Sequence, residues 1–115
     1  MQSDTKTHQY FADGEAPVIM SNADLVQYIV EQAAKAGEVR ARKMFGDYAL
    51  YCNNKVVGLI CDDYLYLKPL PQLEPLLHNE DKQMRPPYDG AKPHYVITDV
   101  DDADYVSRLV QTVAR

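Results

Sequence analysis

The chain has 115 residues, which is enough for one domain and too few for two. Its net charge of −5 argues against a domain that binds nucleic acid by itself, because such domains are usually basic. Two cysteines are too few for a disulfide framework, and no apolar run approaches the ~20 residues of a membrane-spanning helix. The first residues also lack the apolar core of a signal peptide, so we expect a cytoplasmic protein without membrane association.

Residues 1–19 show neither helical nor strand periodicity. We expect an N-terminal arm there, flexible or not native, followed by one domain over residues 20–115. A first helix is predicted over residues 22–36, with Ser21 as its cap and Gly37 as the residue that ends it. Beyond it, the loose alternation and basic character of residues 39–45 predict a short edge strand.

The middle of the chain carries the strongest folding signal. Asn53-Asn54 and Asp62-Asp63 are typical of two-residue hairpin turns, because Asn and Asp tolerate positive φ better than other non-glycine residues. The flanking segments are rich in Tyr, Val, Leu and Ile, as strands require. The pattern therefore predicts a three-stranded antiparallel meander whose register is set by the two turns, with Leu50 opposite Val57.

Strict alternation along the meander gives the sheet two faces. The more aliphatic face should take the helices; it carries Ala49, Tyr51, Val56, Gly58, Ile60, Leu65 and Leu67. The opposite face is apolar but richer in tyrosine; it carries Tyr48, Leu50, Cys52, Val57, Leu59, Cys61, Tyr64 and Tyr66. The two cysteines share this second face but are not opposite each other, so we expect no disulfide between them.

The C-terminal half predicts a short helix that begins at Pro71, a short strand near residues 85–88 and a clear strand over residues 94–98. A last helix follows Asp99, with an apolar stripe through Val106, Leu109, Val110 and Val113. The expected fold class is α+β with two layers. Its order is helix, three-stranded antiparallel meander, short helix, two strands and helix, with the first and last helices on one face of the sheet.

Few patterns in the chain point to chemistry. The acidic run Asp99, Asp101, Asp102 and Asp104 lacks the glycine and glutamate of a calcium loop, and helix capping explains it better. The three histidines have no zinc-ligand spacing with the cysteines. A nucleophilic pair of Cys52 or Cys61 with His94 is conceivable, but neither cysteine lies at a helix N-terminus. We assign no catalytic, cofactor-binding or metal residue and expect no cofactor and no enzyme activity.

Arg40, Arg42 and Lys43 form the one compact basic cluster of the sequence. Beside tyrosines, such a cluster can bind nucleic acid through phosphate contacts and stacking. The alternative is an edge strand whose charges discourage aggregation, and we favour it.

An uncovered tyrosine-rich face would mark an interface. A two-layer fold leaves one sheet face without helices, and the residues expected there are Tyr48, Leu50, Val57, Leu59, Tyr64 and Tyr66. We therefore expect a homodimer or a protein partner on this face, with Tyr64 and Tyr66 central. The alternative is that the arm or the loop over residues 79–93 folds over these side chains.

Two segments carry a family resemblance: residues 40–51, RARKMFGDYALY, and residues 55–68, KVVGLICDDYLYLK. With the later Pro-Pro-Tyr and Pro-His-Tyr segments, they closely resemble the TfoX N-terminal domain family of competence regulators over residues 20–115. Asp47 and Ala49 stand where the family often has glycine.

The resemblance implies a two-layer fold similar to type III secretion chaperones, and a link to the regulation of DNA-uptake genes. The family offers no established catalytic residue to transfer. In longer members a second, C-terminal domain accompanies this one. From the resemblance we expect a non-enzymatic interaction module involved in regulating transcription or competence; the alternative is direct nucleic-acid binding through Arg40, Arg42 and Lys43.

Overall fold

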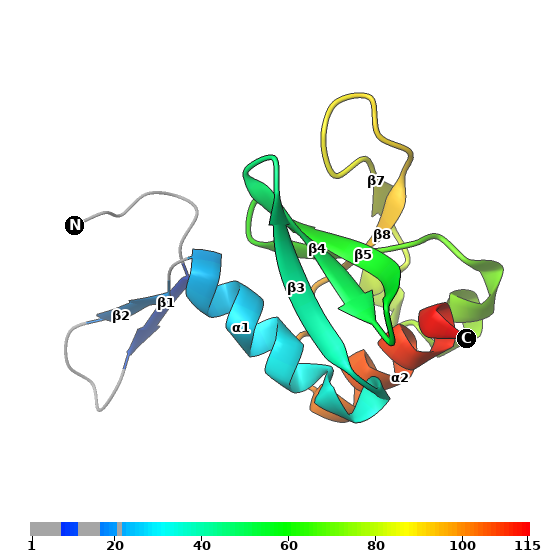
Figure 1. The fold of residues 1–115 in the computed structure, drawn as a ribbon, viewed down its shortest axis with the longest axis horizontal. Helices are drawn as coiled ribbons and strands as arrows, with labels where there is room; N and C mark the ends of the chain where they lie inside the picture. Colours follow the sequence, from blue (N-terminus) through cyan, green and yellow to red (C-terminus); the bar gives the residue numbers. More distant parts are fainter. Residues whose placement is uncertain (1–7, 12–16, 21) are drawn as a thin grey trace.

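The computed structural model describes residues 8–11, 17–20 and 22–115 (Figure 1). Its helices are two α-helices and three short 3-10 helices: α1 (Asn22–Gln32), α2 (Ala103–Ala114), η1 (Ala34–Ala36), η2 (Pro71–Leu76) and η3 (Asn79–Asp81). No helix in these ranges is long and apolar enough to cross a membrane. The expected α+β class is confirmed.

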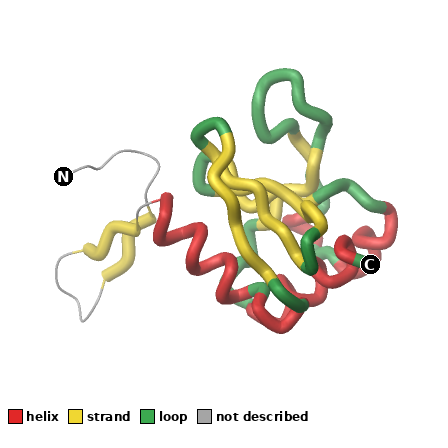
Figure 2. Tube along the Cα trace, in the orientation of Figure 1, coloured by secondary structure: helices red, strands yellow, loops and turns green. Residues whose placement is uncertain are grey.

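A single antiparallel sheet of six strands forms the centre of the domain. Its strands are β3 (Val39–Met44), β4 (Asp47–Cys52), β5 (Lys55–Cys61), β6 (Tyr64–Leu67), β7 (Met84–Arg85) and β8 (His94–Ile97). They lie in the order β3-β4-β5-β6-β8-β7. The tube view draws all strands in yellow (Figure 2). The predicted meander is therefore part of a larger sheet, because the expected edge strand joins it on one side and the two later strands join it on the other.

The N-terminal segment differs from the expected arm. β1 (His8–Phe11) pairs antiparallel with β2 (Pro17–Met20) in a separate two-stranded sheet, which the sequence did not predict. The predicted flexibility of residues 1–7 and 12–16, and the predicted cap at Ser21, lie outside the described residues. The first helix is also shorter than expected, because α1 ends at Gln32 and its last turn tightens into η1 before Gly37.

Both predicted meander turns are present. Asn53 and Asn54 have φ of 53° and 69°, and Asp62 and Asp63 have φ of 49° and 70°. These values belong to the left-handed region that a two-residue hairpin turn requires at both central positions. Asn and Asp reach it at low cost, so the residue types explain why the chain reverses at these two points.

The predicted register fails at one position in the middle of β5. Cys52 pairs with Lys55 and Tyr51 with Val56, as expected, but Leu50 pairs with Gly58 instead of Val57. Val57 is thus an extra residue in a β-bulge, and the alternation of β5 shifts by one from this point. Relative to β4, the residues of β5 after the bulge therefore face the side opposite to the one that a regular strand would give them.

The main core lies between the sheet and the two helices, which lie below the sheet in Figure 1. Ile29 of α1, Leu50 of β4, Val57 of β5 and Leu109 of α2 are all at most 1% exposed and belong to one cluster. The predicted apolar stripe of α2 is confirmed as its buried side. Asp102 caps this helix, since its Oδ1 accepts a hydrogen bond of 3.1 Å from the backbone N–H of Tyr105.

Gly58 lies where β5 approaches β6 most tightly for a glycine of this chain that the structure describes. A Cβ atom at this position would lie 2.0 Å from the carbonyl oxygen of Tyr66 on the neighbouring strand. That distance is far below any van der Waals contact, and the clashing atom belongs to the backbone. A side chain here would force β5 and β6 apart.

Asp81 holds the C-terminal half of the domain together. Its carboxylate is fully buried, and Oδ1 accepts hydrogen bonds from the backbone N–H of Thr98 at 2.9 Å and from the Thr98 hydroxyl at 2.7 Å. Oδ2 accepts a third bond of 2.7 Å from the hydroxyl of Tyr105. Hydrogen bonds to a charged group contribute about 1.5–3 kcal/mol each, so one side chain firmly ties η3 to the end of β8 and to α2.

We predict that Gly58→Ala lowers the free energy of unfolding by about 3 kcal/mol, because the added methyl group meets the backbone of β6. Urea denaturation followed by circular dichroism measures the change. Gly90→Ala is the matched control: unlike Gly58, Gly90 has no atom within 4 Å of an added Cβ, and its φ is 87°, so only the backbone cost of about 1 kcal/mol applies. Equal losses for the two variants would contradict the packing account.

Candidate functional site

The sheet has a face that the helices do not cover, which we call the outer face. A small buried cluster of Cys61, Tyr66 and Val96 lies on it, and Leu59 packs against this cluster. It is separate from the main core under the helices. The sheet therefore has apolar residues on both faces: the helices cover one face, and the outer face has no helix over it.

Arg85 lies over the tyrosines of β6 on the outer face. Its guanidinium carbon is 4.5 Å from the ring centre of Tyr64 and 5.6 Å from that of Tyr66. Its Nε also donates a hydrogen bond of 3.1 Å to the Tyr66 hydroxyl. The long polar segment before β8 thus returns to the sheet and buries part of one tyrosine pair, as one of our alternatives expected.

An apolar groove opens beside these residues, which we call the outer groove. It has a volume of about 510 Å³ and is lined by Met44, Phe45, Asp47, Tyr48, Leu59, Cys61 and Tyr88. A second hollow of about 610 Å³ adjoins it and shares Asp47 and Tyr88 with it. Residues of two connections line the groove: Phe45 from the β3–β4 hairpin and Tyr88 from the loop between β7 and β8, which both extend toward the top of the view in Figure 1.

Phe45 stands at the tip of the hairpin that borders the groove. Its side chain is 98% exposed, although it is large and apolar. Its φ is 51°, in the left-handed region, followed by Gly46 at 86°. Bulky residues rarely adopt this conformation, which costs roughly 1–2 kcal/mol. The chain therefore keeps an exposed aromatic ring in a strained turn where Asn or Gly would fit better.

Cys61 lies at the base of the outer groove, next to Asp47. Burial, the charge of Asp47 and a hydrogen bond to its carboxylate together raise the pKa of the Cys61 thiol to about 12. A thiol with that pKa stays protonated at neutral pH and is a poor nucleophile. Cys52 lies under the helices instead, where burial raises its pKa and its Sγ is 3.7 Å from the carbonyl oxygen of Ala36. Both cysteines are free thiols.

The proposed Cys–His pairs are not formed. His94 directs Nδ1 to the carbonyl oxygen of Lys92 at 2.8 Å. Among the residues that the structure describes, no hydrogen bond joins His94 to Cys52 or Cys61. The expectation that the cysteines share a face is also wrong, because the bulge places Cys52 in the main core and Cys61 on the outer face.

The six residues predicted for one open face are divided between both sides of the sheet. Leu59, Tyr64 and Tyr66 lie on the outer face, as expected. Leu50 and Val57 are fully buried in the main core, and Tyr48 packs against it. The physical reason is the bulge, which the assumption of strict alternation omits. Tyr66 is 3% exposed, so its predicted role as a central exposed contact residue is wrong, whereas Tyr64 remains 41% exposed.

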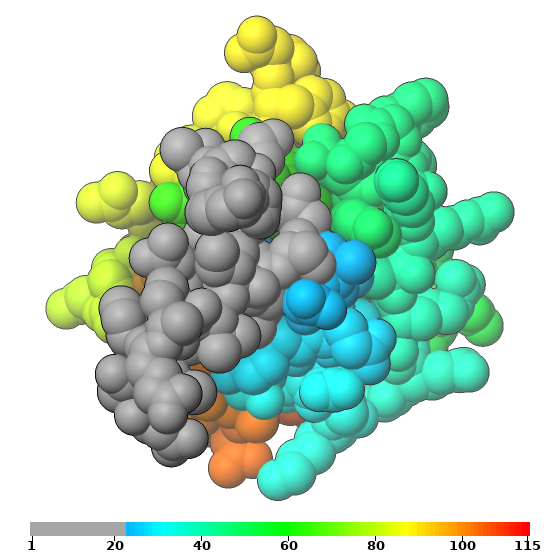
Figure 3. Space-filling model, turned by 90° about the vertical axis from the view of Figure 1, so that its left-hand side faces the viewer, coloured from blue at the N-terminus to red at the C-terminus, as the bar shows by residue number. Residues whose placement is uncertain are grey.

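The basic segment is divided as well. Arg40 lies over the ring of Tyr51 on the outer face, with 4.5 Å between the guanidinium carbon and the ring centre. Val39 and Ala41 pack against the main core, so alternation along β3 places Arg42 with Arg40 and places Lys43 on the opposite side. Figure 3 shows the β3 region, in teal, at the edge of the molecule beside α1. The sequence cluster is therefore not one surface patch.

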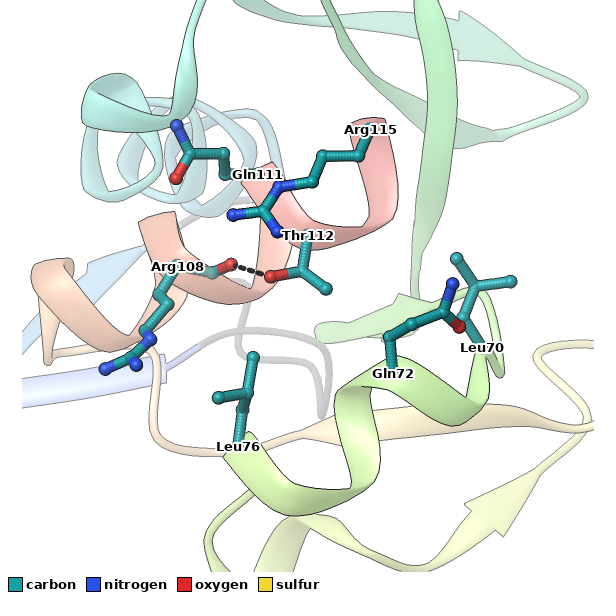
Figure 4. Close-up of a pocket in the computed structure, with 7 residues that line it drawn as sticks. All are labelled: Leu70, Gln72, Leu76, Arg108, Gln111, Thr112 and Arg115. Carbon is teal, nitrogen blue, oxygen red and sulfur yellow. Dashed lines mark hydrogen bonds between the residues drawn. The ribbon is translucent and has the colours of Figure 1, made fainter.

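Another hollow, of about 440 Å³, lies between η2 and the C-terminal half of α2 (Figure 4). Arg108 and Arg115 border it, and the Arg108 carbonyl oxygen accepts a 2.8 Å hydrogen bond from the Thr112 hydroxyl. Their guanidinium groups point in different directions and do not converge on one point (Figure 4). This arrangement is a poor site for an anion, so the outer groove is the stronger candidate.

Sequence reasoning missed four residues that line the outer groove: Met44, Phe45, Asp47 and Tyr88. A signal for Phe45 was present in the sequence. The Phe45-Gly46 pair stands between two strands, at the place where a two-residue turn needs positive φ, and Phe is a poor residue for that place.

Comparison with known proteins identifies the family. The TfoX N-terminal domain model matches residues 31–114. The chain belongs to the TfoX N-terminal domain family. A curated relative, described as an uncharacterized 12.7 kDa protein in the trpE 5′ region of Spirochaeta aurantia, is 39% identical over 80 residues. That alignment covers 70% of this chain and 68% of the relative. The outer groove of this TfoX N-terminal domain lies within the matched residues, and Met44 and Phe45 at the hairpin tip line it.

We predict that Cys61 of the native domain resists iodoacetamide at pH 8, because with a pKa of about 12 only about one thiol in 10,000 is ionised. Asp47→Asn removes the negative charge that faces the thiol, so the pKa should fall and alkylation should quicken roughly tenfold. Mass spectrometry of the separate Cys52 and Cys61 peptides follows the reaction, with Asp89→Asn as a control. Native Cys61 reacting as fast as in unfolded protein would refute the prediction.

Proposed function

We propose that this domain is a non-enzymatic regulatory module that binds a segment of a partner protein in the outer groove. The observation that carries the proposal is Phe45, which is 98% exposed at φ 51° beside an apolar groove. An exposed aromatic residue in a strained conformation stabilises nothing within the domain. Such strain persists at binding sites, where a partner buries the side chain.

The chemistry of the groove indicates the kind of partner. Met44, Leu59 and the ring of Tyr88 supply apolar walls for one large aliphatic or aromatic side chain. Asp47 lines both the groove and its neighbouring hollow, where Asp62 and Asp89 also stand. Arg85 lines the same hollow, so its three carboxylates and one guanidinium leave a net negative charge, which favours basic residues by charge complementarity. The partner segment should therefore carry an apolar anchor flanked by Lys or Arg.

Membership of the family supports a regulatory context for the proposed binding. Membership of the TfoX N-terminal domain family supports a competence-related regulatory module, and a family without established catalytic residues supports binding over catalysis. We propose that the partner is a cytoplasmic protein that regulates the transcription of competence genes. The similarity to type III secretion chaperones stays a prediction.

A second copy of the chain and nucleic acid are the competing occupants of the outer face. We favour a partner protein over a second copy because two acidic rims would repel each other across a symmetric interface. We favour it over nucleic acid because the net charge is −5 and Lys43 does not share a side with Arg40 and Arg42.

The proposal predicts that selection of random displayed peptides on the full chain enriches sequences with one large apolar residue and neighbouring Lys or Arg. Phe45→Asn should weaken the affinity of such a peptide more than about tenfold, as expected for a central aromatic contact. The thermal midpoint of this variant should stay equal or rise, because Asn tolerates φ 51° better than Phe. Fluorescence polarisation gives the affinities, and Gln72→Ala in the hollow near α2 is the matched control.

Three results would each overturn the proposal. The first is that the enriched peptides bind the Phe45→Asn variant as tightly as the unaltered chain. The second is that the chain sediments as a dimer whose association is lost in Phe45→Asn, which would assign the groove to a second copy. The third is that the chain binds duplex DNA with a steep salt dependence that Arg40→Ala removes, which would assign the outer face to nucleic acid.

A further inference from the structure

Three potential metal ligands converge at a place remote from the outer groove. His78 precedes η3, Glu80 lies within η3, and Asp99 follows β8. His78 Nδ1 and one carboxylate oxygen from each acidic residue all lie within 4.8 Å of one another. Sequence spacing does not reveal this group, because Asp99 comes from a different part of the chain.

The imidazole ring of His78 is held in place. It stacks on the ring of Tyr105 with 3.8 Å between the ring centres and 2° between the planes. The backbone N–H of His78 donates a 3.0 Å hydrogen bond to the Tyr105 hydroxyl oxygen. That hydroxyl in turn donates a 2.7 Å hydrogen bond to buried Asp81. The histidine is thus fixed before any ligand arrives.

The charges around the group favour a cation. Asp99 Oδ2 lies 3.0 Å from His78 Nδ1, and in the described part of the chain no lysine or arginine pairs with Asp99 or Glu80. Asp81 is not available as a ligand, because Thr98 and Tyr105 occupy its oxygens. Two carboxylates therefore face one imidazole and solvent.

We propose that His78, Glu80 and Asp99 bind a divalent transition-metal ion, with Zn²⁺ as the best match. One imidazole and two carboxylates suit Zn²⁺ better than Mg²⁺ or Ca²⁺, which prefer oxygen donors alone. Two ligand atoms that share a tetrahedral zinc ion at about 2.0–2.1 Å lie about 3.3 Å apart, close to the observed separation of His78 and Asp99.

The simpler account is a surface ion pair of His78 with Asp99, which gives Glu80 no role. That account does not explain why the Glu80 carboxylate also lies close to the His78 ring, whose position is fixed by stacking on Tyr105. A bound ion would join η3 to the connection between β8 and α2. Three protein ligands would also leave one coordination position open to water or to a group from another molecule.

Isothermal titration of the full chain with ZnCl₂, after removal of metal with a chelator and dialysis, tests the site. We expect one ion per chain and a thermal midpoint that rises by roughly 5 °C at saturation, because the ion binds only the folded state. Glu80→Gln and Asp99→Asn should each weaken binding more than about tenfold, since even groups outside the coordination shell contribute that much.

His94→Ala is the matched control, since His94 lies outside the group. It should not change the affinity. The proposal is overturned if the chain shows no saturable Zn²⁺ binding, if His94→Ala removes it, or if Glu80→Gln binds like the unaltered chain. Glu80 is exposed and makes no described contact within the fold, so this variant should fold normally and its result is decisive.

Discussion

One extra residue in β5 sets the arrangement of the whole domain. Because Val57 is the additional residue of a bulge, Val57 and Leu50 both enter the main core, while Leu59 and Cys61 turn to the outer face. The absence of a side chain at Gly58 lets β5 approach β6 at this point. The helices then cover one side of the sheet, and the other side keeps apolar residues at the base of an open groove.

The groove depends on a second constraint, at the hairpin between β3 and β4. Asn and Asp occupy the left-handed positions of the two meander turns, whereas Phe45 occupies the corresponding position in the third. A turn with Asn there would fold at least as well, so stability alone does not explain the phenylalanine. The strained backbone and the exposed ring of Phe45 both lie beside the outer groove. This coincidence is the physical basis for proposing that the outer face is a binding surface.

The features that could be predicted from the sequence are those that neighbouring residues determine. The turn residues, the strand-forming segments and the apolar stripe of α2 each lead to one structure, and each was confirmed. The bulge was missed because Val56-Val57-Gly58 fits a regular strand as well as a bulged one, and the pairing of β5 with β4 that reveals it depends on another strand. The convergence of His78 with Asp99 depends on the Asp81 contacts between distant segments, which no local pattern encodes.

The central claim is that the outer groove binds a segment of a partner protein. Its most direct test is an NMR titration with a peptide that carries an apolar anchor and flanking basic residues, in which the amide chemical-shift changes are mapped onto the structure. The account predicts that the largest changes fall on the tip and sides of the outer groove, at Phe45, Leu59, Cys61 and Tyr88. Changes centred on α1 and α2, with the groove residues unaffected, would contradict it.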